Sequence, residues 1–318
     1  MKAATQHRYG IDAIEVVEIP IPEPGPGQVR LQVTAASINP ADWHIATGIP
    51  GFMRLTEGLR GPKLSIVGRD VCGVVDAVGA DVTEWQVGDT LFGKAEGAFA
   101  EYALAGVDHL ARVPSNMSDI EAATLPIAGV TALQAVERGE VEGKRVVVNG
   151  ASGGVGHFVV QIAKAAGAAE VVAVCSGRNA DWVRELGADE VIDYEEADFT
   201  RREFDVVIDC IGNRRGREVV RCLPSDGRWV LLGADKKTGF LGPVTRLVGS
   251  MIAWKFRSQH CELLLAEETR ERLERLAELV DEGRLTVRIA GKRPLHDVVD
   301  AYDRIESKRT AGKIVILP

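Results

Sequence analysis

The sequence predicts an α/β protein in which a β-rich region is followed by a doubly wound parallel sheet. From Lys144 onward, short apolar runs alternate with amphipathic helical patterns, and βα units of this size form parallel sheets covered by helices. Before about Pro114, short apolar runs alternate with Gly- and Pro-rich turns, which is typical of a compact barrel with long loops. A length of 318 residues fits two domains.

Composition excludes several classes of protein. The formal charge is 38 − 46 = −8 and aromatic residues make up only 5%, so neither a basic nucleic-acid surface nor a base-stacking platform is expected. The start MKAATQHRYG has no apolar run, and no stretch of about 20 apolar residues occurs, so we expect neither a signal peptide nor a membrane span. We therefore expect a cytoplasmic protein.

The cysteines argue against a disulfide framework. Their number is odd and no two have CxxC spacing, which also disfavours a four-thiolate zinc site. We expect reduced, buried thiols. The five are Cys72, Cys175, Cys210, Cys222 and Cys261.

The β-rich region contains the runs QVRLQVTAA and CGVVDAVG, separated by PIPEPGPG and followed by WQVGD. A helical pattern then opens at SDIEAATLP, where Ser118 is a plausible N-cap with Glu121 three residues later. The predicted parallel strands are KRVVVNG, EVVAVC, EVID, DVVIDC and RWVLLG. Two helices are predicted between the first three strands: GVGHFVVQIAKAAG follows the first strand, and ADWVRELG follows the second and ends at Gly187.

The last part of the chain predicts one long helix and one strand. Glu267 to Val280 is a charged amphipathic helix with an apolar stripe, and AGKIVILP is a strand. Before them, Phe240 to Trp254 is apolar but is broken by Pro243 and Arg246. We interpret that segment as a surface lobe that shapes a hydrophobic pocket.

The segment Asn149 to Gly156, NGASGGVG, follows a predicted strand and opens a predicted helix, as a dinucleotide-binding loop does. Its glycines let the backbone approach a pyrophosphate, and the helix N-terminus offers free N–H groups. Ala151 replaces the first glycine of the usual GxGxxG. The alternative is a glycine-rich turn without a ligand. The expected phosphate contacts are Ser152, Gly153, Gly154 and Val155.

Cofactor choice depends on the turn after EVVAVC. NAD-binding proteins place an acidic residue there, but no Asp or Glu lies between Glu170 and Asp181. Ser176, Arg178 and Asn179 occupy the turn instead, and a guanidinium suits a 2′-phosphate. The sequence therefore predicts NADPH rather than NADH, unless Arg178 is only a surface arginine.

These residues, in this order, resemble the medium-chain dehydrogenase/reductase superfamily and, more narrowly, its zinc-free quinone oxidoreductase branch. The resemblance covers essentially the whole chain. The motifs that carry it are ASINPADW, GRDVCGVVDAVGADVTEWQVGD, LPIAGVTALQAV, VIDY, IDCIG, LLG and AGKIVI.

The resemblance implies a GroES-like β-barrel catalytic domain, residues 1–118 and 266–318, and a Rossmann domain with a doubly wound parallel sheet, residues 119–265. Cofactor and substrate would bind between them. It also implies a homodimer formed through the last strand of the Rossmann sheet, within Ser258 to Ala266.

The same resemblance predicts a site without metal. Zinc-dependent relatives have Cys in the first loop and His-Glu in the barrel motif, but here Asn39 stands in the loop and Arg69 and Asp70 follow Gly68. Neither thiolate nor imidazole is present for zinc. Cys72 is interpreted as a packing residue.

Several further residues are candidates for the site, and the resemblance implies Asn39, Thr131 and Tyr194 among them. Asn39 is the candidate donor to the substrate oxygen, or else it structures the loop before Pro40, and Asp42 caps or braces that loop. Lys313 faces the cleft, unless it is an ordinary solvated lysine, and His157 is interpreted as packed or exposed. Those expected near the cofactor are Thr131 (or an ordinary helix threonine), Tyr194, Gly212 and Gly233.

The predicted reaction is hydride transfer from NADPH to a small hydrophobic acceptor, a quinone or an α,β-unsaturated carbonyl. Such acceptors are already electrophilic and need no Lewis acid. Two alternatives remain open: an alcohol dehydrogenase of the same superfamily, and a non-catalytic NADPH-binding sensor.

Overall fold

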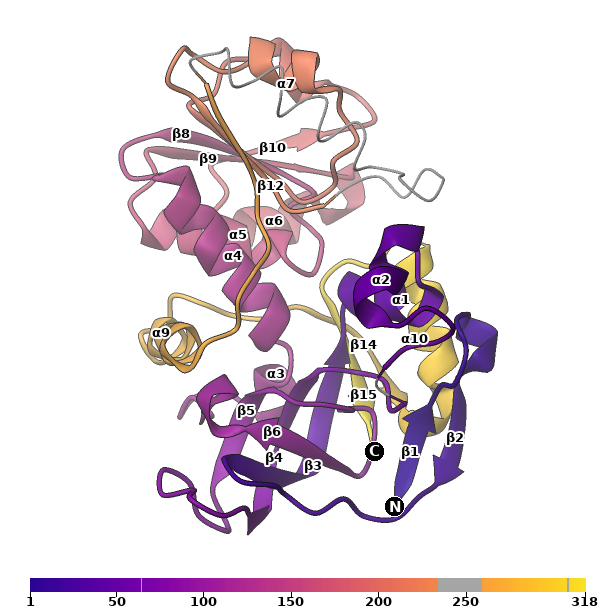
Figure 1. The fold of residues 1–318 in the computed structure, drawn as a ribbon. Coiled ribbons are helices and arrows are strands. Elements are labelled where there is room, and N and C mark those ends of the chain that lie inside the picture. Colours follow the sequence, from indigo (N-terminus) through magenta and orange to yellow (C-terminus); the bar gives the residue numbers. More distant parts are fainter. Residues whose placement is uncertain (64, 234–258, 308) are drawn as a thin grey trace. The chain divides into compact units, whose positions relative to one another are not determined.

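The structure is a computed structural model that describes residues 1–63, 65–233, 259–307 and 309–318. The chain divides into two compact units, residues 1–130 with 267–318 and residues 131–266 (Figure 1). One unit contains a mainly antiparallel sheet and the other an entirely parallel sheet. The predicted α/β class is therefore confirmed. The predicted lobe from Phe240 to Trp254 lies outside the described residues.

The first unit is built around β3, an 11-residue strand whose side chains alternate between buried and partly exposed over its first half. Its main sheet has the order β14-β15-β3-β4-β5-β7, and β6 pairs with β3. The strands are β1 (Lys2–Thr5), β2 (Glu15–Glu18), β3 (Gln28–Ile38), β4 (Asp70–Val78), β5 (Thr90–Lys94), β6 (Tyr102–Gly106), β7 (Leu110–Arg112), β14 (Ile289–Pro294) and β15 (Lys313–Leu317). The helices are α1 (Pro40–Thr47), α2 (Arg54–Glu57), α3 (Asp119–Ala122), α9 (Arg270–Asp281) and α10 (Val298–Glu306).

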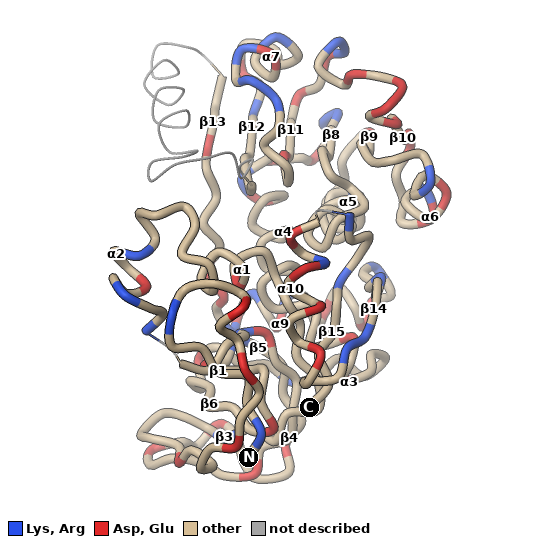
Figure 2. Tube along the Cα trace, turned by 90° about the vertical axis from the view of Figure 1, so that its right-hand side faces the viewer, with Lys and Arg blue, Asp and Glu red and all other residues tan. Residues whose placement is uncertain are grey.

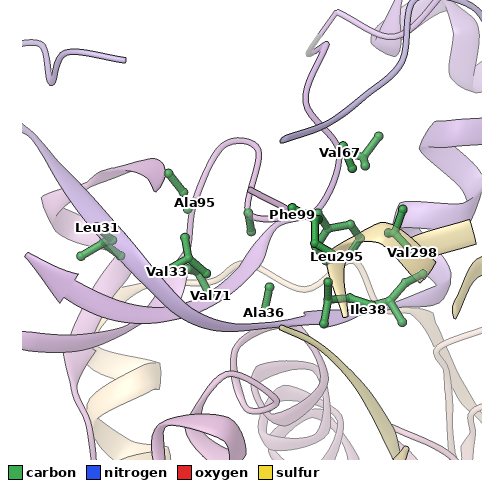
Figure 3. Packing of buried hydrophobic residues seen from close by; sticks show 14 of the residues in the cluster. Leu31, Val33, Ala36, Ile38, Val67, Val71, Ala95, Phe99, Leu295 and Val298 are labelled. Atoms are coloured by element: carbon green, nitrogen blue, oxygen red, sulfur yellow. The ribbon is translucent and has the colours of Figure 1, made fainter. Parts of the chain in front are cut away.

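A single hydrophobic core holds this unit together. Figure 3 shows Val33 of β3 beside Val71 of β4, and Ile38 beside Val298 of α10. These side chains are 0–7% exposed, and burying each one contributes about 1.5–3 kcal/mol. The core therefore fixes the end of β3, which is followed by Asn39 and the start of α1 within the motif ASINPADW.

The second unit is a six-stranded parallel sheet in the order β10-β9-β8-β11-β12-β13. Its strands are β8 (Arg145–Asn149), β9 (Glu170–Cys175), β10 (Glu190–Asp193), β11 (Val206–Asp209), β12 (Arg228–Leu231) and β13 (His260–Leu263). Helices α5 (Gly156–Ala165) and α6 (Ala180–Glu185) lie on one face and α7 (Gly216–Arg221) on the other (Figure 1). The strand order reverses between β8 and β11, which is where doubly wound sheets bind ligands.

The sequence patterns of these elements are confirmed. The strands β8, β9 and β11 are almost entirely buried, as expected for strands covered on both faces. Ser118 begins α3 through a reciprocal capping box with Glu121. Lys, Arg, Asp and Glu lie mostly on turns and helices, with both signs interspersed (Figure 2).

Helix α4 (Pro126–Gly139) begins in the first unit and continues into the second. Its N-terminal turn is fixed within the first unit, because the Ile127 backbone N–H donates to Asp70 Oδ1 at 3.0 Å. Thr131 lies one helical turn beyond Ile127 on the same face. Asp70 therefore holds the start of the helix that carries Thr131.

Candidate active site

The strand register of the first unit brings Asn39, Asp70 and Lys313 together. The pairing of β4 with β3 places Asp70 opposite Ser37. The antiparallel pairing of β15 with β3 brings Lys313, the first residue of β15, beside Asn39, which directly follows β3. Residues that lie 274 positions apart in the sequence thus share one buried site.

A continuous set of hydrogen bonds joins the three side chains. Lys313 Nζ donates to Asn39 Oδ1 at 2.5 Å, and Asn39 Nδ2 donates to Asp70 Oδ2 at 2.7 Å. Lys313 Nζ also lies 3.6 Å from Asp70 Oδ2, to which the Ser37 hydroxyl donates at 3.0 Å. Asn39, Asp70 and Lys313 are only 2%, 0% and 3% exposed. The alternative that Lys313 is a solvated surface lysine is therefore wrong.

Asp42 and Arg69 complete the cluster. The Asp42 carboxylate accepts the Asn39 backbone N–H at 2.8 Å and so braces the start of α1. Arg69 Nε lies 3.7 Å from Asp42 Oδ1. The cluster therefore contains two carboxylates and two cations, and its charges balance when all four groups are ionised.

Burial and pairing have opposite effects on the protonation of this cluster. Burial raises the pKa of Asp70 to about 6, although Lys313 opposes the rise. Burial also raises the pKa of Asp42, opposed by Arg69, and lowers the pKa of Lys313, opposed by Asp70. A change in any one of these charges therefore affects the others.

The donor set here does not fit a zinc ion. Zinc sites use thiolates, imidazoles or carboxylates, whereas an ammonium and a guanidinium lie against both carboxylates of this cluster. Cys72, two residues beyond Asp70 on β4, is fully buried, and burial raises the pKa of its thiol. Within the described ranges, no group of three His, Cys, Asp or Glu residues is arranged to hold a metal.

In the second unit, the predicted phosphate loop joins β8 to α5. Within the described residues, the backbone N–H groups of Ser152, Gly154 and Val155 donate no hydrogen bond. They lie at or next to the N-terminus of a ten-residue helix, where free N–H groups and the helix dipole favour a phosphate. The loop therefore fits the pyrophosphate of a nicotinamide dinucleotide.

Two side chains support the loop from neighbouring positions. Asn179 Nδ2 donates to Ser152 Oγ at 3.2 Å. His157 is fully buried, and its Nδ1 lies 2.9 Å from the Gly153 carbonyl oxygen. His157 is thus a packed residue of α5 that braces the loop.

The turn after β9 carries Ser176 and Arg178, as the sequence predicts. Arg178 is exposed, and it forms no ion pair within the described part of the chain. Its neighbour Gly177 donates its backbone N–H to Asp193 Oδ2 at 2.8 Å. Tyr194 follows β10 and is 51% exposed, and its backbone N–H donates to the Cys175 carbonyl oxygen at 3.2 Å. Arg178 and Tyr194 therefore flank the ends of two adjacent strands.

Asp193 was not predicted as part of this site, and Asn179 was predicted only to lie in its turn. The parallel register pairs Asp193 with Cys175, so the last residues of EVID and EVVAVC meet at one edge of the sheet. The sequence could have indicated Asp193, because both runs were predicted as parallel strands and the ends of such strands meet at one edge of the sheet. The sequence places Asn179 in the turn, but its hydrogen bond to Ser152 joins residues 27 positions apart and forms only when the loop is folded.

At the reversal of strand order, Asn149 and Asp209 end β8 and β11. Asn149 Nδ2 donates to Asp209 Oδ1 at 2.8 Å, and the same oxygen accepts the Gly212 N–H at 2.9 Å. Gly212 has φ of +67°, a conformation that favours glycine. A Cβ on Gly233 would lie 2.6 Å from the Cys210 carbonyl oxygen. Both predicted glycines are thus required by the backbone at the carboxyl edge of the sheet.

The cysteines are all unpaired: three are buried, while Cys210 and Cys261 are half-buried. Burial raises the pKa of Cys175 and Cys222 to about 11 and that of Cys261 to about 12. These thiols are therefore protonated and unreactive at neutral pH.

Comparison with known proteins agrees with this arrangement. The family described as "Alcohol dehydrogenase GroES-like domain" matches residues 25–115, and the family described as "Zinc-binding dehydrogenase" matches residues 186–316. The chain is 34% identical over 329 residues to a chloroplastic quinone-oxidoreductase homolog of Spinacia oleracea, covering 97% of this chain and 95% of that protein. It is 32% identical to 2-methylene-furan-3-one reductase of Solanum lycopersicum, covering 100% of this chain and 79% of that protein.

Solved structures show the same fold. The quinone oxidoreductase of Coxiella burnetii matches with a TM-score of 0.87 and 30% identity, covering 100% of this chain and 99% of that chain. A cobalt- and zinc-bound alcohol dehydrogenase of Pyrobaculum aerophilum matches with a TM-score of 0.81 and 26% identity, covering 100% of this chain and 99% of that chain. A GroES-like unit combined with a Rossmann unit defines an oxidoreductase that uses a nicotinamide cofactor. The chain belongs to the medium-chain dehydrogenase/reductase superfamily and is quinone-oxidoreductase-like within it.

None of the helices among the described residues has both the length and the apolar character needed to cross a bilayer.

Proposed function

We propose that this protein uses NADPH to reduce a quinone or an α,β-unsaturated carbonyl compound, without zinc. The observation that carries the proposal is the buried Asn39–Asp70–Lys313 cluster, which supplies hydrogen-bond donors and balanced charge where a metal would need thiolate or imidazole ligands. The names of two relatives, a quinone-oxidoreductase homolog and an enone reductase, support this class of acceptor.

The protein's contribution to the reaction is orientation and hydrogen bonding. When bound, the nicotinamide supplies a hydride to the acceptor, and a proton from solvent completes the reduction. Negative charge develops on the acceptor oxygen, so a donor directed at that oxygen lowers the barrier. Asn39 has two amide hydrogens, and Asp70 accepts one of them. The Asn39 side chain also forms a hydrogen bond with the Asp42 carboxylate. We assign the second amide hydrogen to the acceptor oxygen once an acceptor is bound, with Asp42 holding the loop that presents it.

For the cofactor, we propose that the loop from Ser152 to Val155 holds the pyrophosphate. Ser176 and Arg178 would bind the 2′-phosphate, because an exposed guanidinium next to a turn can form a forked hydrogen bond with it. Tyr194 borders the same phosphate. The residues proposed to contact the rest of the cofactor are Thr131, Gly212, Gly233 and Lys313.

We also propose a cytoplasmic homodimer that acts on a small hydrophobic substrate. The strand β13 is the terminal described strand of its sheet, and Leu263 and Leu265 beside this edge are 36% and 78% exposed. An exposed apolar strand edge favours pairing with a second copy. Several relatives are named as chloroplastic or mitochondrial, so fractionation of cells with an antibody tests the compartment.

The test of the proposed function is NADPH oxidation with a panel of quinones and enones, using protein whose zinc content is measured by mass spectrometry. Turnover at far less than one zinc per chain supports the proposal. One zinc per chain with activity on alcohols supports an alcohol dehydrogenase instead. Tight NADPH binding without turnover on any acceptor supports the non-catalytic sensor.

A further inference from the structure

We propose that Lys313 and Asp70 are positioning residues that orient the Asn39 amide and balance the charge around it, a role that rests on the proposed function of Asn39. The two residues come from strands on either side of β3 and meet at its end. Neither residue is required to touch the acceptor for this role.

The orientation of the Asn39 amide follows from its two partners. A lysine ammonium can only donate hydrogen bonds, and an ionised carboxylate can only accept them. The amide oxygen therefore lies against Lys313 and the amide nitrogen against Asp70. Rotating the amide by 180° would oppose donor with donor and acceptor with acceptor in a buried site, which is costly. The second amide hydrogen thus has one fixed direction.

The charge balance gives the two residues opposite effects on the reaction. Lys313 and Arg69 offset Asp70 and Asp42. Loss of Lys313 raises the pKa of Asp70 further, because Lys313 opposes that rise. At a pH where Asp70 is still ionised, the loss leaves an excess negative charge in a buried site, where charges are poorly screened, and that charge opposes charge development on an acceptor oxygen. Loss of Asp70 has the reverse effect, so removing both restores the balance.

A purely structural ion pair predicts a different result. Removing one partner of a buried pair destabilises the fold because the other charge is left unpaired. Such damage would lower the free energy of unfolding of both single variants and the fraction of folded protein, and removing both partners would relieve it. The free energy of unfolding and the kcat per folded molecule, measured together for each variant, therefore separate positioning from stability.

The kinetic test compares Lys313→Met, Asp70→Asn and the double variant on a weakly activated enone. We expect Lys313→Met to lower kcat at least tenfold, measured at saturating NADPH and at a pH where Asp70 is ionised. Adding Asp70→Asn should then raise kcat at least threefold. Lys292→Met, on an exposed lysine of the neighbouring strand β14, is the matched control and should match the wild type. A double variant no faster than Lys313→Met overturns the proposal.

A second measurement does not depend on turnover. The chain has five asparagines, Asn39, Asn116, Asn149, Asn179 and Asn213, so ¹⁵N-asparagine labelling resolves their side-chain amides by NMR. We expect the Asn39 amide resonances to shift in Lys313→Met while the other four stay in place. An unmoved Asn39 signal overturns the proposal even if the wild type reduces no acceptor, a result that by itself would contradict only the proposed function.

A third variant covers the case in which Lys313→Met does not fold. Lys313→Gln keeps a donor for Asn39 Oδ1 but removes the charge. It should leave the Asn39 amide resonances nearer to those of the wild type, yet still lower kcat on the enone. A wild-type kcat for this variant contradicts the role of charge.

Discussion

A Cβ atom on Gly156 would lie 2.1 Å from the carbonyl oxygen of Gly150, at the point where α5 packs against the end of β8. Gly156→Ala must therefore push the helix away from the strand. We expect a loss of about 1–3 kcal/mol in the free energy of unfolding, the usual cost of overpacking, together with weaker NADPH binding. Gly153 is the matched control, because a Cβ there meets only the Gly150 oxygen, at 3.2 Å. Gly153→Ala should weaken NADPH binding and keep most of the stability, as measured by urea denaturation.

Arg178 is expected to set the preference for NADPH. Arg178→Ala should weaken NADPH binding by about 1.5–3 kcal/mol, the scale of one charged hydrogen bond, and barely change NADH binding. Calorimetric titration with both cofactors measures this. Arg221→Ala is the control, because Arg221 ends α7 and so lies at the amino edge of the sheet, opposite the ligand edge. Equal weakening of both cofactors would show that Arg178 does not contact the 2′-phosphate.

Asn39→Ala should lower turnover of a weakly activated enone by about tenfold or more, because one donor to the developing oxyanion is lost. A strongly oxidising quinone should be affected much less, because its reduction already has a large driving force. NADPH affinity should stay the same, since the phosphate loop is untouched. Asn116→Ala, another loop asparagine of the first unit with a hydrogen bond to a carbonyl, is the kinetic control. Unchanged turnover of both acceptors would make Asn39 a structural residue only.

The raised pKa of Asp70 predicts a pH-dependent stability. Its pKa is about 6 in the folded protein against 3.8 for the free side chain, so between these values the folded state binds more protons than the unfolded state. The free energy of unfolding of the wild type, relative to Asp70→Asn, should therefore fall as pH rises from 4 to 7, by up to about 3 kcal/mol. The charged groups that act on Asp70 are Lys313 and Asp42, and its uncharged hydrogen-bond partners are Asn39, Ser37 and the Ile127 backbone N–H. Urea denaturation at several pH values tests this, and a difference that stays constant contradicts it.

Light scattering should give a particle of twice the chain mass of 34.2 kDa at micromolar concentration. Leu263→Lys places a charge at the edge strand β13 and should yield monomers. Leu59→Lys is the control, because Leu59 is an exposed leucine of the first unit, 74% exposed. A wild-type mass of a single chain rules out the dimer at that concentration.

The sequence predicted well the elements whose signals are local. The run EVVAVC, the loop NGASGGVG and the cap at Ser118 each depend on neighbouring residues, and each became the expected element. The Asn39 site depends on register between strands far apart in the sequence. Lysine is usually exposed, so nothing near Lys313 indicated that it would be buried against Asn39. Asp193 was missed for the same reason, since it reaches Gly177 from the next strand.

The pairing of β15 with β3 also determines when this site can form during synthesis. At typical rates of translation, the ribosome needs tens of seconds to add the 274 residues that separate Asn39 from Lys313. The Rossmann unit is one continuous segment and can fold during that interval, while β3 is paired with β4 and β6 but still lacks β15. Part of the apolar surface of the first unit therefore stays exposed in the nascent chain until β15 is synthesised. Molecular chaperones bind exposed apolar surface of this kind.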